Sequence, residues 1–452
     1  MTVTTTGAGV VMAADLVSQS AEAVFPSEDP LFSELVSYRS RRESFYRRFG
    51  GLWPGTLLDP YDLLEVYPLP SEEIAAITQA AEAMARIHRR TSTLLRTVPD
   101  EALLQMGLPR ETLNLSRMQT PGMPDTVIGR LDLVKTVDSY KMLEFNADTP
   151  GLLVETFAIN AKVCDESGKI NPNQHGETAL IAALKGAICA GLEYVGRTEG
   201  EQGNVVFTSR STYKRDEDIA LYLMGLLALP NGIQKHYVPL EMLRGDEQGL
   251  YDSNGKQIDV VYRFHPIQFF RGKMFRDNNG GNADMYDGAL LFDLVSRRRL
   301  AIINPPSAFM LGSKAVQSII WGLFQQGIYF SAEERFLIER YFLPTYMDPV
   351  FYDEPYVVKP VYGSEGDTVS IINSRPGEVF RSNNSTYVDQ PMVYQKYVEL
   401  PRIEIMTEDG RRSLSLLTSC FLIDGQPVGI SLRAGEAITD FSWWSVPICV
   451  AP

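Results

Sequence analysis

The chain has 452 residues, of which 44% are hydrophobic and 22% charged. This composition is typical of a globular protein that buries a large core and forms more than one lobe. The formal net charge of −14 argues against a nucleic-acid partner, because such binding depends on Lys and Arg contacts to phosphates. An acidic protein is better matched to small cationic partners such as amines.

The cysteines and histidines show no spacing typical of a metal site. The four cysteines lie far apart without a C-x-x-C pair, which argues against zinc or a disulfide framework and fits a reducing cytoplasm. They are Cys164, Cys189, Cys420 and Cys449. No segment approaches the ~20 apolar residues of a membrane helix, and the start has no basic region before its apolar residues. We therefore expect no membrane partner, and a poorly ordered tail over residues 1–30.

Polar or acidic first turns, with Gly or Pro near several ends, mark the expected helices. They begin at Ser71 as N-cap and at Asp100, and they cover 149–163, 177–195, 219–229, 314–326 and 331–341, the last with a capping box. Buried strands are predicted at 205–208, 260–264 and 301–303, and the chain is strand-rich after 353. Strands alternating with helices predict an α/β (α+β) fold with mixed sheets and a helical N-terminal part.

Residues 128–148 are expected to form a hairpin of two strands. Strand side chains alternate between faces, so four polar residues share one face: Arg130, Asp132, Glu144 and Asn146. Leu131, Leu133, Leu143 and Phe145 share the other. If the turn centres on Asp138, Asp132 lies opposite Glu144, and Arg130 lies opposite Asn146.

Two carboxylates directly opposite each other repel, which favours a cation between them. Carboxylate and amide oxygens are hard ligands that suit Mg²⁺ better than zinc, and the adjacent Arg130 suits the phosphate oxygens that such a metal carries. A half-exposed hairpin with solvated polar residues is the alternative interpretation of the same pattern.

A glycine loop lies between two expected strands over residues 356–372. Lys359 ends the first strand, and Gly363 and Gly366 allow the backbone close to phosphate oxygens. The segment is neither a Walker loop nor a Rossmann fingerprint; it is similar to the way that kinases and ATP-grasp enzymes cover ATP. A plain β-hairpin remains the alternative. Lys314 begins a helix, where backbone amides favour anions, and a strand near 393–401 can present backbone groups to an adenine edge.

Taken together, these motifs resemble the glutathionylspermidine synthase family of acid–amine ligases, which have an ATP-grasp-type fold. The matching segments occur in family order over roughly residues 40–452. They are Arg130-Leu-Asp132, the run from Leu143 to Pro150, Ser313-Lys-Ala315 with Trp321, the runs 343–346, 358–366 and 394–401, and the run from Gly429 to Arg433. The resemblance predicts one ligase domain over 31–452, with a nucleotide lobe at about 310–452.

The resemblance also implies roles for individual residues. Mg²⁺ would be held by Asp132, Glu144 and Asn146. Catalytic contacts to phosphate, acyl phosphate or tetrahedral intermediate would come from Arg130 and Arg433. ATP would be held by Lys314, Lys359, Gly363, Gly366, Gln395, Lys396, Tyr397 and Val398. Substrate contacts would come from Thr149 for the acid, and from Asp216 and Glu217 for a thiol-peptide or an amine.

Three departures from the family pattern bear on substrates. The bifunctional members carry an N-terminal amidase domain, for which this sequence has no room, so it resembles the stand-alone ligase-like members. Ser364 replaces the arginine of the usual GREG loop, which puts a phosphate contact there in doubt. The segment from Val261 to Pro266 lacks the tryptophan that usually follows, so the acid substrate is expected to differ.

The sequence therefore predicts an ATP- and Mg²⁺-dependent carbon–nitrogen ligase that forms ADP. Its expected substrates are a peptide or amino-acid carboxylate and an amine or polyamine, without a nucleic-acid or membrane partner. A phosphotransferase acting on a hydroxyl or a protein is one alternative, and a non-catalytic ATP-binding protein is another. The oligomeric state is not predicted.

Overall fold

The computed structural model describes residues 30–48, 61–198, 200–270, 288–350, 354–373, 379–439 and 442–452. The tail predicted for residues 1–30 lies, apart from Pro30, outside this part of the chain. Several sheets, both antiparallel and parallel, combine with helices around two hydrophobic cores. The predicted mixed α/β fold is confirmed.

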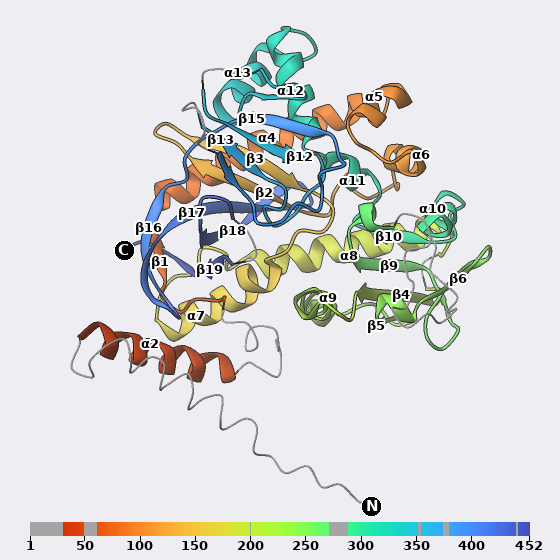
Figure 1. Ribbon diagram of the computed structural model, residues 1–452. Helices are drawn as coiled ribbons and strands as arrows, with labels where there is room; N and C mark the ends of the chain where they lie inside the picture. The colour runs from red at the N-terminus through yellow and green to blue at the C-terminus, as the bar shows by residue number, and fades with distance from the viewer. Residues whose placement is uncertain are drawn as a thin grey trace, which may run out of the picture.

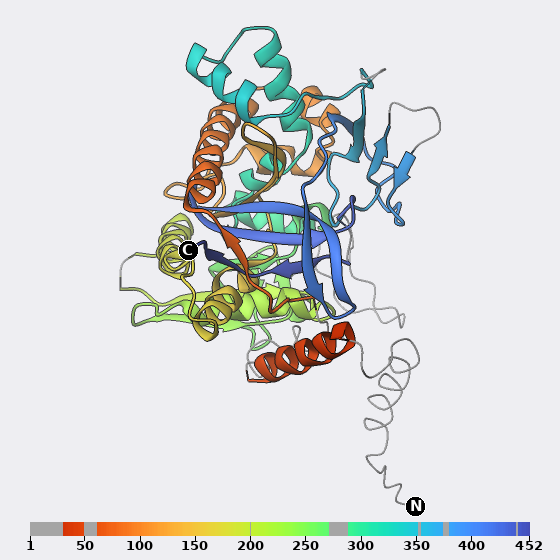
Figure 2. The same ribbon diagram turned by 90° about the vertical axis from the view of Figure 1, so that its left-hand side faces the viewer.

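A mainly antiparallel sheet forms the centre of the molecule, with the order β19-β18-β17-β2-β3 and with β16 paired to β17. Its strands are β2 (Ile128–Lys135), β3 (Tyr140–Asn146), β16 (Arg402–Thr407), β17 (Gly410–Ile423), β18 (Gln426–Gly435) and β19 (Trp444–Val446). The long helix α4 (Ser71–Leu95) packs across β3, β17 and β18 and buries Ile77, Met84 and Ile87. Figure 2 shows α4 in orange alongside the long blue strands.

A smaller parallel sheet lies beside the central one, in the order β10-β9-β4-β5. Its strands are β4 (Gly203–Ser209), β5 (Ile233–Tyr237), β9 (Val260–Phe264) and β10 (Ala301–Ile303). Helix α8 (Gly176–Tyr194) contacts β9 and β10 on one side and β17 and β18 on the other, and so it separates the two sheets (Figure 1). Helix α9 (Lys214–Leu226) packs on β4, β5 and β9.

The predicted strand-rich segment after residue 353 supplies most of a third sheet, which lies over β2 and β3 in Figure 1. Its order is β11-β15-β12-β13-β14, and its strands are β11 (Thr345–Tyr346), β12 (Tyr356–Pro360), β13 (Ser370–Ile372), β14 (Val379–Arg381) and β15 (Met392–Lys396). Helix α12 (Ala315–Gln325) packs against β11, and α13 (Ala332–Tyr341) packs against α4 and α12.

The remaining elements complete the described chain. The helices among them are α2 (Pro30–Arg47), α5 (Asp100–Gln105), η1 (Arg110–Thr112), α6 (Leu113–Arg117), η2 (Val154–Ile159), α7 (Asn160–Glu166), η3 (Leu240–Met242), η4 (Ile267–Phe269), α10 (Gly288–Ser296) and α11 (Ser307–Leu311). The strands are β1 (Tyr67–Leu69) paired with β20 (Ile448–Val450), and β6 (Arg244–Asp246), β7 (Gly249–Tyr251) and β8 (Gln257–Ile258).

Several helix predictions hold to within a few residues. Helix α8 matches the prediction for 177–195, and the capping box of α13 is present: Ser331 Oγ accepts from the Glu334 amide at 3.2 Å, and the Ser331 amide donates to Glu334 Oε2 at 2.9 Å. Ser71 is the first residue of α4 rather than its N-cap, and Pro70 precedes it. Lys314, predicted inside a helix, directly precedes α12.

The helix predicted for 149–163 is wrong in its first turn. Helical structure begins only at Val154, as a π-helical turn that continues into α7. Leu152 adopts a positive φ of 75°, and Arg130 Nη1 donates to the carbonyl of Gly151 at 3.1 Å. These features hold residues 149–152 in an irregular turn directly beside the polar face of the hairpin.

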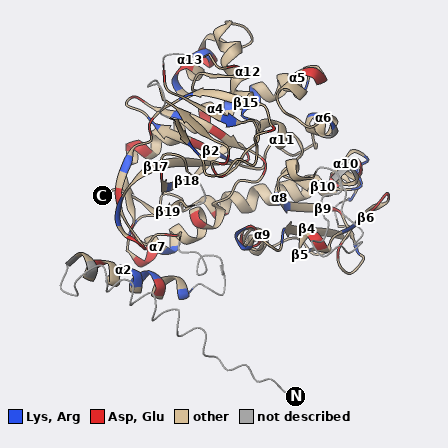
Figure 3. Ribbon diagram, viewed as in Figure 1, with Lys and Arg blue, Asp and Glu red and all other residues tan. Residues whose placement is uncertain are grey.

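Charges of both signs are spread along the elements, and α2 carries both within one helix (Figure 3). Among the helices of the described chain, none combines the length and apolar character needed to cross a bilayer. Cys164, Cys420 and Cys449 are buried and Cys189 is exposed, and all four are free thiols.

Candidate functional site

Four neighbouring strands of the central sheet present polar side chains to one another. The register pairs Asp132 with Glu144 and Arg130 with Asn146, as the sequence predicted. On the other side of β2, Ser419 of β17 lies opposite Asp132. The next strand, β18, contributes Arg433, whose Nη2 lies 2.6 Å from Asp132 Oδ2. The period of two gathers the hairpin residues, and the long-range pairing of β17 and β18 with the hairpin adds Ser419 and Arg433.

A β-bulge interrupts the hairpin directly after the two charged rungs. Asp132 pairs with Glu144, but the next residue, Leu133, pairs with Met142, so Leu143 is the extra residue of β3. The sequence placed Leu143 on the apolar face; this is wrong, because the bulge puts Met142 in the core instead. Leu143 is only partly buried and lines the cavity described below.

Asp132 is the centre of a buried ion-pair network. Arg130 donates to both of its carboxylate oxygens, from Nε at 2.8 Å and from Nη2 at 2.9 Å, and Ser419 Oγ donates to Oδ1 at 2.7 Å. Burial alone would raise the pKa of Asp132, but the guanidiniums of Arg130 and Arg433 outweigh it and hold that pKa well below the usual range of an aspartate. The carboxylate is therefore ionised at neutral pH.

Glu144 is the second carboxylate of this face, and Lys314 is its partner. Lys314 Nζ lies 3.1 Å from Glu144 Oε2 and donates to the carbonyl of Gly363 at 3.1 Å. Burial would raise the pKa of Glu144, but the charge of Lys314, assisted by Lys359, lowers it. Asn146 Nδ2 lies 3.2 Å from both Asp132 Oδ2 and Glu144 Oε1 and so bridges the two carboxylates.

The bulge also releases a backbone acceptor into the site. The Leu143 carbonyl accepts from Lys359 Nζ at 3.0 Å, Gln317 Nε2 at 3.1 Å and Gln395 Nε2 at 3.3 Å. Burial lowers the pKa of Lys359 to about 8, and the charge of Glu144 opposes this shift. The Lys359 ammonium group is therefore mainly charged at neutral pH and loses its proton as the pH rises through about 8.

These groups border one cavity of about 290 Å³. Every predicted site residue except Asp216 and Glu217 lines it. The lining includes Arg130, Asp132, Glu144, Asn146, Thr149, Lys314, Lys359, Gly363, Gly366, Gln395, Lys396, Tyr397, Val398 and Arg433. Residues far apart in the sequence thus come together at the junction of the central sheet and the third sheet.

Apolar side chains of the third sheet form another part of the lining. Val357 and Ile371 are cross-strand partners on β12 and β13, and both border the cavity. The adjacent residues predicted at an adenine edge are partly engaged elsewhere. The Lys396 amide donates to the carbonyl of Pro344 at 2.9 Å, and Lys396 Nζ pairs with Glu354 at 2.7 Å. An adenine ring bound here would therefore pack against apolar side chains and would not bond to the amide of Lys396.

The glycine loop borders the cavity next to Lys314, which donates to the Gly363 carbonyl. Gly366 has a φ of +65°, and a Cβ atom there would lie 2.6 Å from the carbonyl oxygen of Thr439, so only glycine fits. Ser364, which replaces the arginine of the related motif, has its hydroxyl 3.2 Å from that of Tyr387. The close contact with Thr439 therefore requires a glycine at position 366 whether or not the loop binds phosphate.

Asp216 and Glu217 lie in the first turn of α9 and do not line the cavity. Glu217 pairs with Lys214 Nζ at 2.7 Å. Burial raises the pKa of Asp216 to about 7, and the charge of Glu365, a cavity residue, adds to the rise. Asp216 is therefore an electrostatic neighbour of the cavity, and Glu217 has a local partner.

The polar face of β2 and β3 fits a hard cation. Asp132 and Glu144 are ionised and adjacent, and a half-turn of the Asn146 amide would present its oxygen in place of Nδ2. Within the described residues, no group of three or more His, Cys, Asp or Glu side chains gathers in the manner of a metal site. The candidate set differs from such groups because its third member is an amide.

Some residues of the site were not singled out from the sequence. Ser419 and Gln317 are buried hydrogen-bond partners of Asp132 and of the Leu143 carbonyl. Ser419 lies in the strand segment Leu417-Thr-Ser-Cys-Phe421. No local sequence pattern marks it as a site residue; the pairing of β17 with β2 places it opposite Asp132. Asn304, described below, follows a predicted buried strand, and a polar residue at such a strand end is a usable signal.

The fold is of the ATP-grasp type found in glutathione synthetase-like structures. The chain superimposes on a glutathione synthetase-like effector from Globodera pallida with a TM-score of 0.56 at 13% identity, covering 94% of this chain and 98% of that one. It belongs to the glutathionylspermidine synthase pre-ATP-grasp family, whose model matches residues 60–451.

Two curated relatives show the same likeness. The bifunctional glutathionylspermidine synthetase/amidases of Escherichia coli (strain K12) and Shigella flexneri are each 21% identical to this chain over 329 residues. The matched region covers 69% of this chain and 47% of each relative. The chain thus spans about half the length of the curated relatives that it matches.

Proposed function

We propose that this protein is an ATP- and Mg²⁺-dependent acid–amine ligase that forms an amide through an acyl phosphate and releases ADP. The carrying observation is the gathering of Arg130, Arg433, Lys314 and Lys359 around the ionised Asp132–Glu144 pair in one cavity. Such a site suits phosphoryl transfer, in which the protein mainly positions groups and stabilises charge.

In the first step, an oxygen of the substrate carboxylate attacks the γ-phosphorus of ATP, and the bond to the bridging oxygen of ADP breaks. Lys314 and Lys359 hold the nucleotide phosphates, and Arg130 offers its guanidinium to the transferring group. Bound Mg²⁺, held by Asp132, Glu144 and Asn146, would neutralise charge on the phosphate oxygens. Thr149, on the turn beside Arg130, is the proposed contact to the acid.

In the second step, the amine nitrogen attacks the acyl carbon, the carbon–oxygen bond to phosphate breaks, and the nitrogen loses a proton. We propose that Arg433 stabilises the negative charge of the tetrahedral intermediate; its guanidinium, buried at the cavity wall, supports this role. We propose a peptide or amino-acid carboxylate as the acid and an amine or polyamine as acceptor. A cytoplasmic location stays a prediction.

Incubation of the protein with ATP, Mg²⁺ and a pool of peptides, amino acids and polyamines is expected to yield ADP, phosphate and a new condensed product. Mass spectrometry should find a species with the mass of acid plus amine minus water. AMP and pyrophosphate would contradict the acyl-phosphate route, and a phosphorylated hydroxyl would instead indicate a phosphotransferase.

The affinity for a cationic amine is expected to rise as the pH rises from 6 to 8. The pKa of Asp216 is about 7, so its carboxylate becomes ionised over this interval and attracts a cation more strongly. In Asp216→Asn the KM for the amine should be higher and should lose this pH dependence. Glu193→Gln, which removes an exposed carboxylate from α8, serves as the control. An unchanged pH profile in Asp216→Asn would contradict an amine contact.

A further inference from the structure

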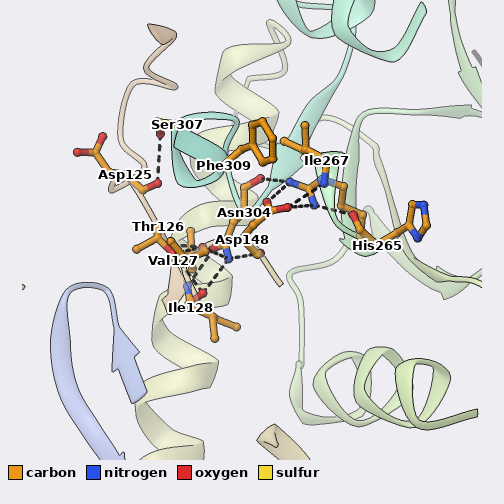
Figure 4. Close-up of polar contacts among 12 residues, drawn as sticks. Asp125, Thr126, Val127, Ile128, Asp148, His265, Ile267, Asn304, Ser307 and Phe309 are labelled. Carbon is orange, nitrogen blue, oxygen red and sulfur yellow. Dashed lines mark hydrogen bonds and ion pairs between the residues drawn. The ribbon is translucent and has the colours of Figure 1, made fainter. Parts of the chain in front are cut away.

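Asn304 joins two separate segments at the open end of the hairpin (Figure 4). Its Oδ1 accepts from the backbone amides of Val127 at 2.8 Å and Ile128 at 3.0 Å. Its Nδ2 lies within hydrogen-bond distance of the carbonyls of Ile128 at 2.8 Å, Ala147 at 3.1 Å and Asp148 at 2.8 Å. Asn304 is only 2% exposed, and its side chain holds the start of β2 against the end of β3.

An ion pair holds the same end of the hairpin from the parallel sheet. Arg263, on β9, contacts both carboxylate oxygens of Asp148, with Nη2 2.5 Å from Oδ1 and Nη1 3.2 Å from Oδ2. Asp148 Oδ2 also accepts from the amide of Ile267 at 2.9 Å, and Arg263 Nη1 donates to the carbonyl of His265 at 2.8 Å. A two-pronged contact of this kind fixes orientation as well as distance.

Both contacts bear directly on the cavity. Asp148 lines it and lies between Asn146 and Thr149, which line it too. Asn304 follows β10 and precedes α11, after which the chain reaches Lys314, the partner of Glu144. The two contacts therefore set the position of the polar face of β2 and β3 relative to the parallel sheet and to the segment that carries Lys314.

We propose that Asn304 and the Asp148–Arg263 pair are positioning residues that hold the carboxylate face of the hairpin in the geometry needed for Mg²⁺–nucleotide binding. This inference rests on the proposed function and extends it to residues that do not touch the reacting atoms. Groups that orient metal ligands typically change metal affinity or activity by about 10- to 100-fold when they are removed.

The test measures the binding of a non-hydrolysable ATP analogue by calorimetry at a series of Mg²⁺ concentrations. It needs neither substrate, so it stands apart from the identity of the acid and the amine. In Asn304→Ala the Mg²⁺ concentration for half-maximal binding is expected to rise about 10- to 100-fold. Arg263→Lys keeps the charge but cannot span both oxygens of Asp148, so its Mg²⁺ requirement should rise by a smaller factor.

Asn173→Ala provides the matched control. Asn173 is also buried and bridges backbone groups, since it donates to the carbonyls of Thr156 and Ile430 and accepts from the Ile430 amide, but it does not line the cavity. Its loss is expected to lower the melting temperature without changing the Mg²⁺ requirement. If Asn304→Ala lowers the melting temperature alone, like the control, the inference is overturned.

The remaining outcomes separate this inference from the proposed function. If Asn304→Ala does not fold, Arg263→Lys decides by the same criterion. Normal binding in the unaltered chain with an unchanged Mg²⁺ requirement in the variants would overturn the positioning role alone. Absence of Mg²⁺-dependent binding in the unaltered chain would overturn the proposed function, and the positioning role with it.

Discussion

Asp132→Asn is expected to reduce Mg²⁺-dependent ATP turnover by more than about 100-fold, because even residues that only orient metal ligands contribute up to that factor. Asparagine preserves the size of the side chain and keeps an acceptor for Ser419. It removes the negative charge that faces Arg130 and Arg433, so two buried guanidiniums lose their shared counter-charge. Turnover against Mg²⁺ concentration is the measurement.

The same variant should also be less stable. Breaking a buried ion pair by removing one partner typically costs about 3–5 kcal/mol. Asp259→Asn is a suitable control. Asp259 is a buried carboxylate directly before β9 of the parallel sheet; it pairs with Arg197 at 2.8 Å and does not line the cavity. We expect the control to lose stability while it retains turnover. Normal turnover and Mg²⁺ dependence in Asp132→Asn would contradict the metal assignment.

Lys359→Met is expected to weaken Mg²⁺–ATP binding by about 2 kcal/mol, or roughly 30-fold. Methionine preserves much of the apolar stem but removes the ammonium group, which is buried beside Glu144 and donates to the Leu143 carbonyl. Calorimetry at several pH values measures the effect. In the unaltered chain, binding should weaken as the pH rises through about 8, because Lys359 then loses its charge.

The sign of this pH effect follows from the protonation state. Below pH 8 the lysine is mainly cationic and attracts the phosphates, whereas above it the neutral amine does not. Lys359→Met should remove the dependence. Lys235→Met is the control, since burial also lowers the pKa of Lys235, which lies on β5 and bonds to the Met224 carbonyl instead of lining the cavity. An unchanged pH profile in Lys359→Met would argue against a phosphate contact.

The polar face of the hairpin was predictable because it depends on local rules. Alternation of side chains along β2 and β3, together with one turn position, determines that Asp132 meets Glu144 and that Arg130 meets Asn146. The C-terminal end of α8 and the capping box of α13 were predictable for the same reason, since Gly196 and the Ser331–Glu334 pair act within one helical turn.

Features that depend on distant contacts were not predictable from local patterns. The bulge at Leu143 depends on distant residues, because Lys359, Gln317 and Gln395 all donate to the Leu143 carbonyl. The irregular turn at 149–152 has a sequence with Pro at a favourable helix position, but the hydrogen bond from Arg130 and the positive φ of Leu152 oppose a helix there. That Lys314, Lys359 and Arg433 share a site with the hairpin was predicted from the family resemblance and not from residue spacing.

The bulge separates the register of the charged rungs from that of the distal part of the hairpin by one residue. Beyond it, the strands run on to the turn, where Val137 is fully exposed. An extra residue inserted at that tip would be accommodated by the turn and the distal rungs, so the charged rungs would keep their register. A deletion at Leu143 would do the reverse, because it would remove the offset and shift the distal half by one residue. We therefore expect related chains to vary in length at residues 136–139 but not between Glu144 and Asn146.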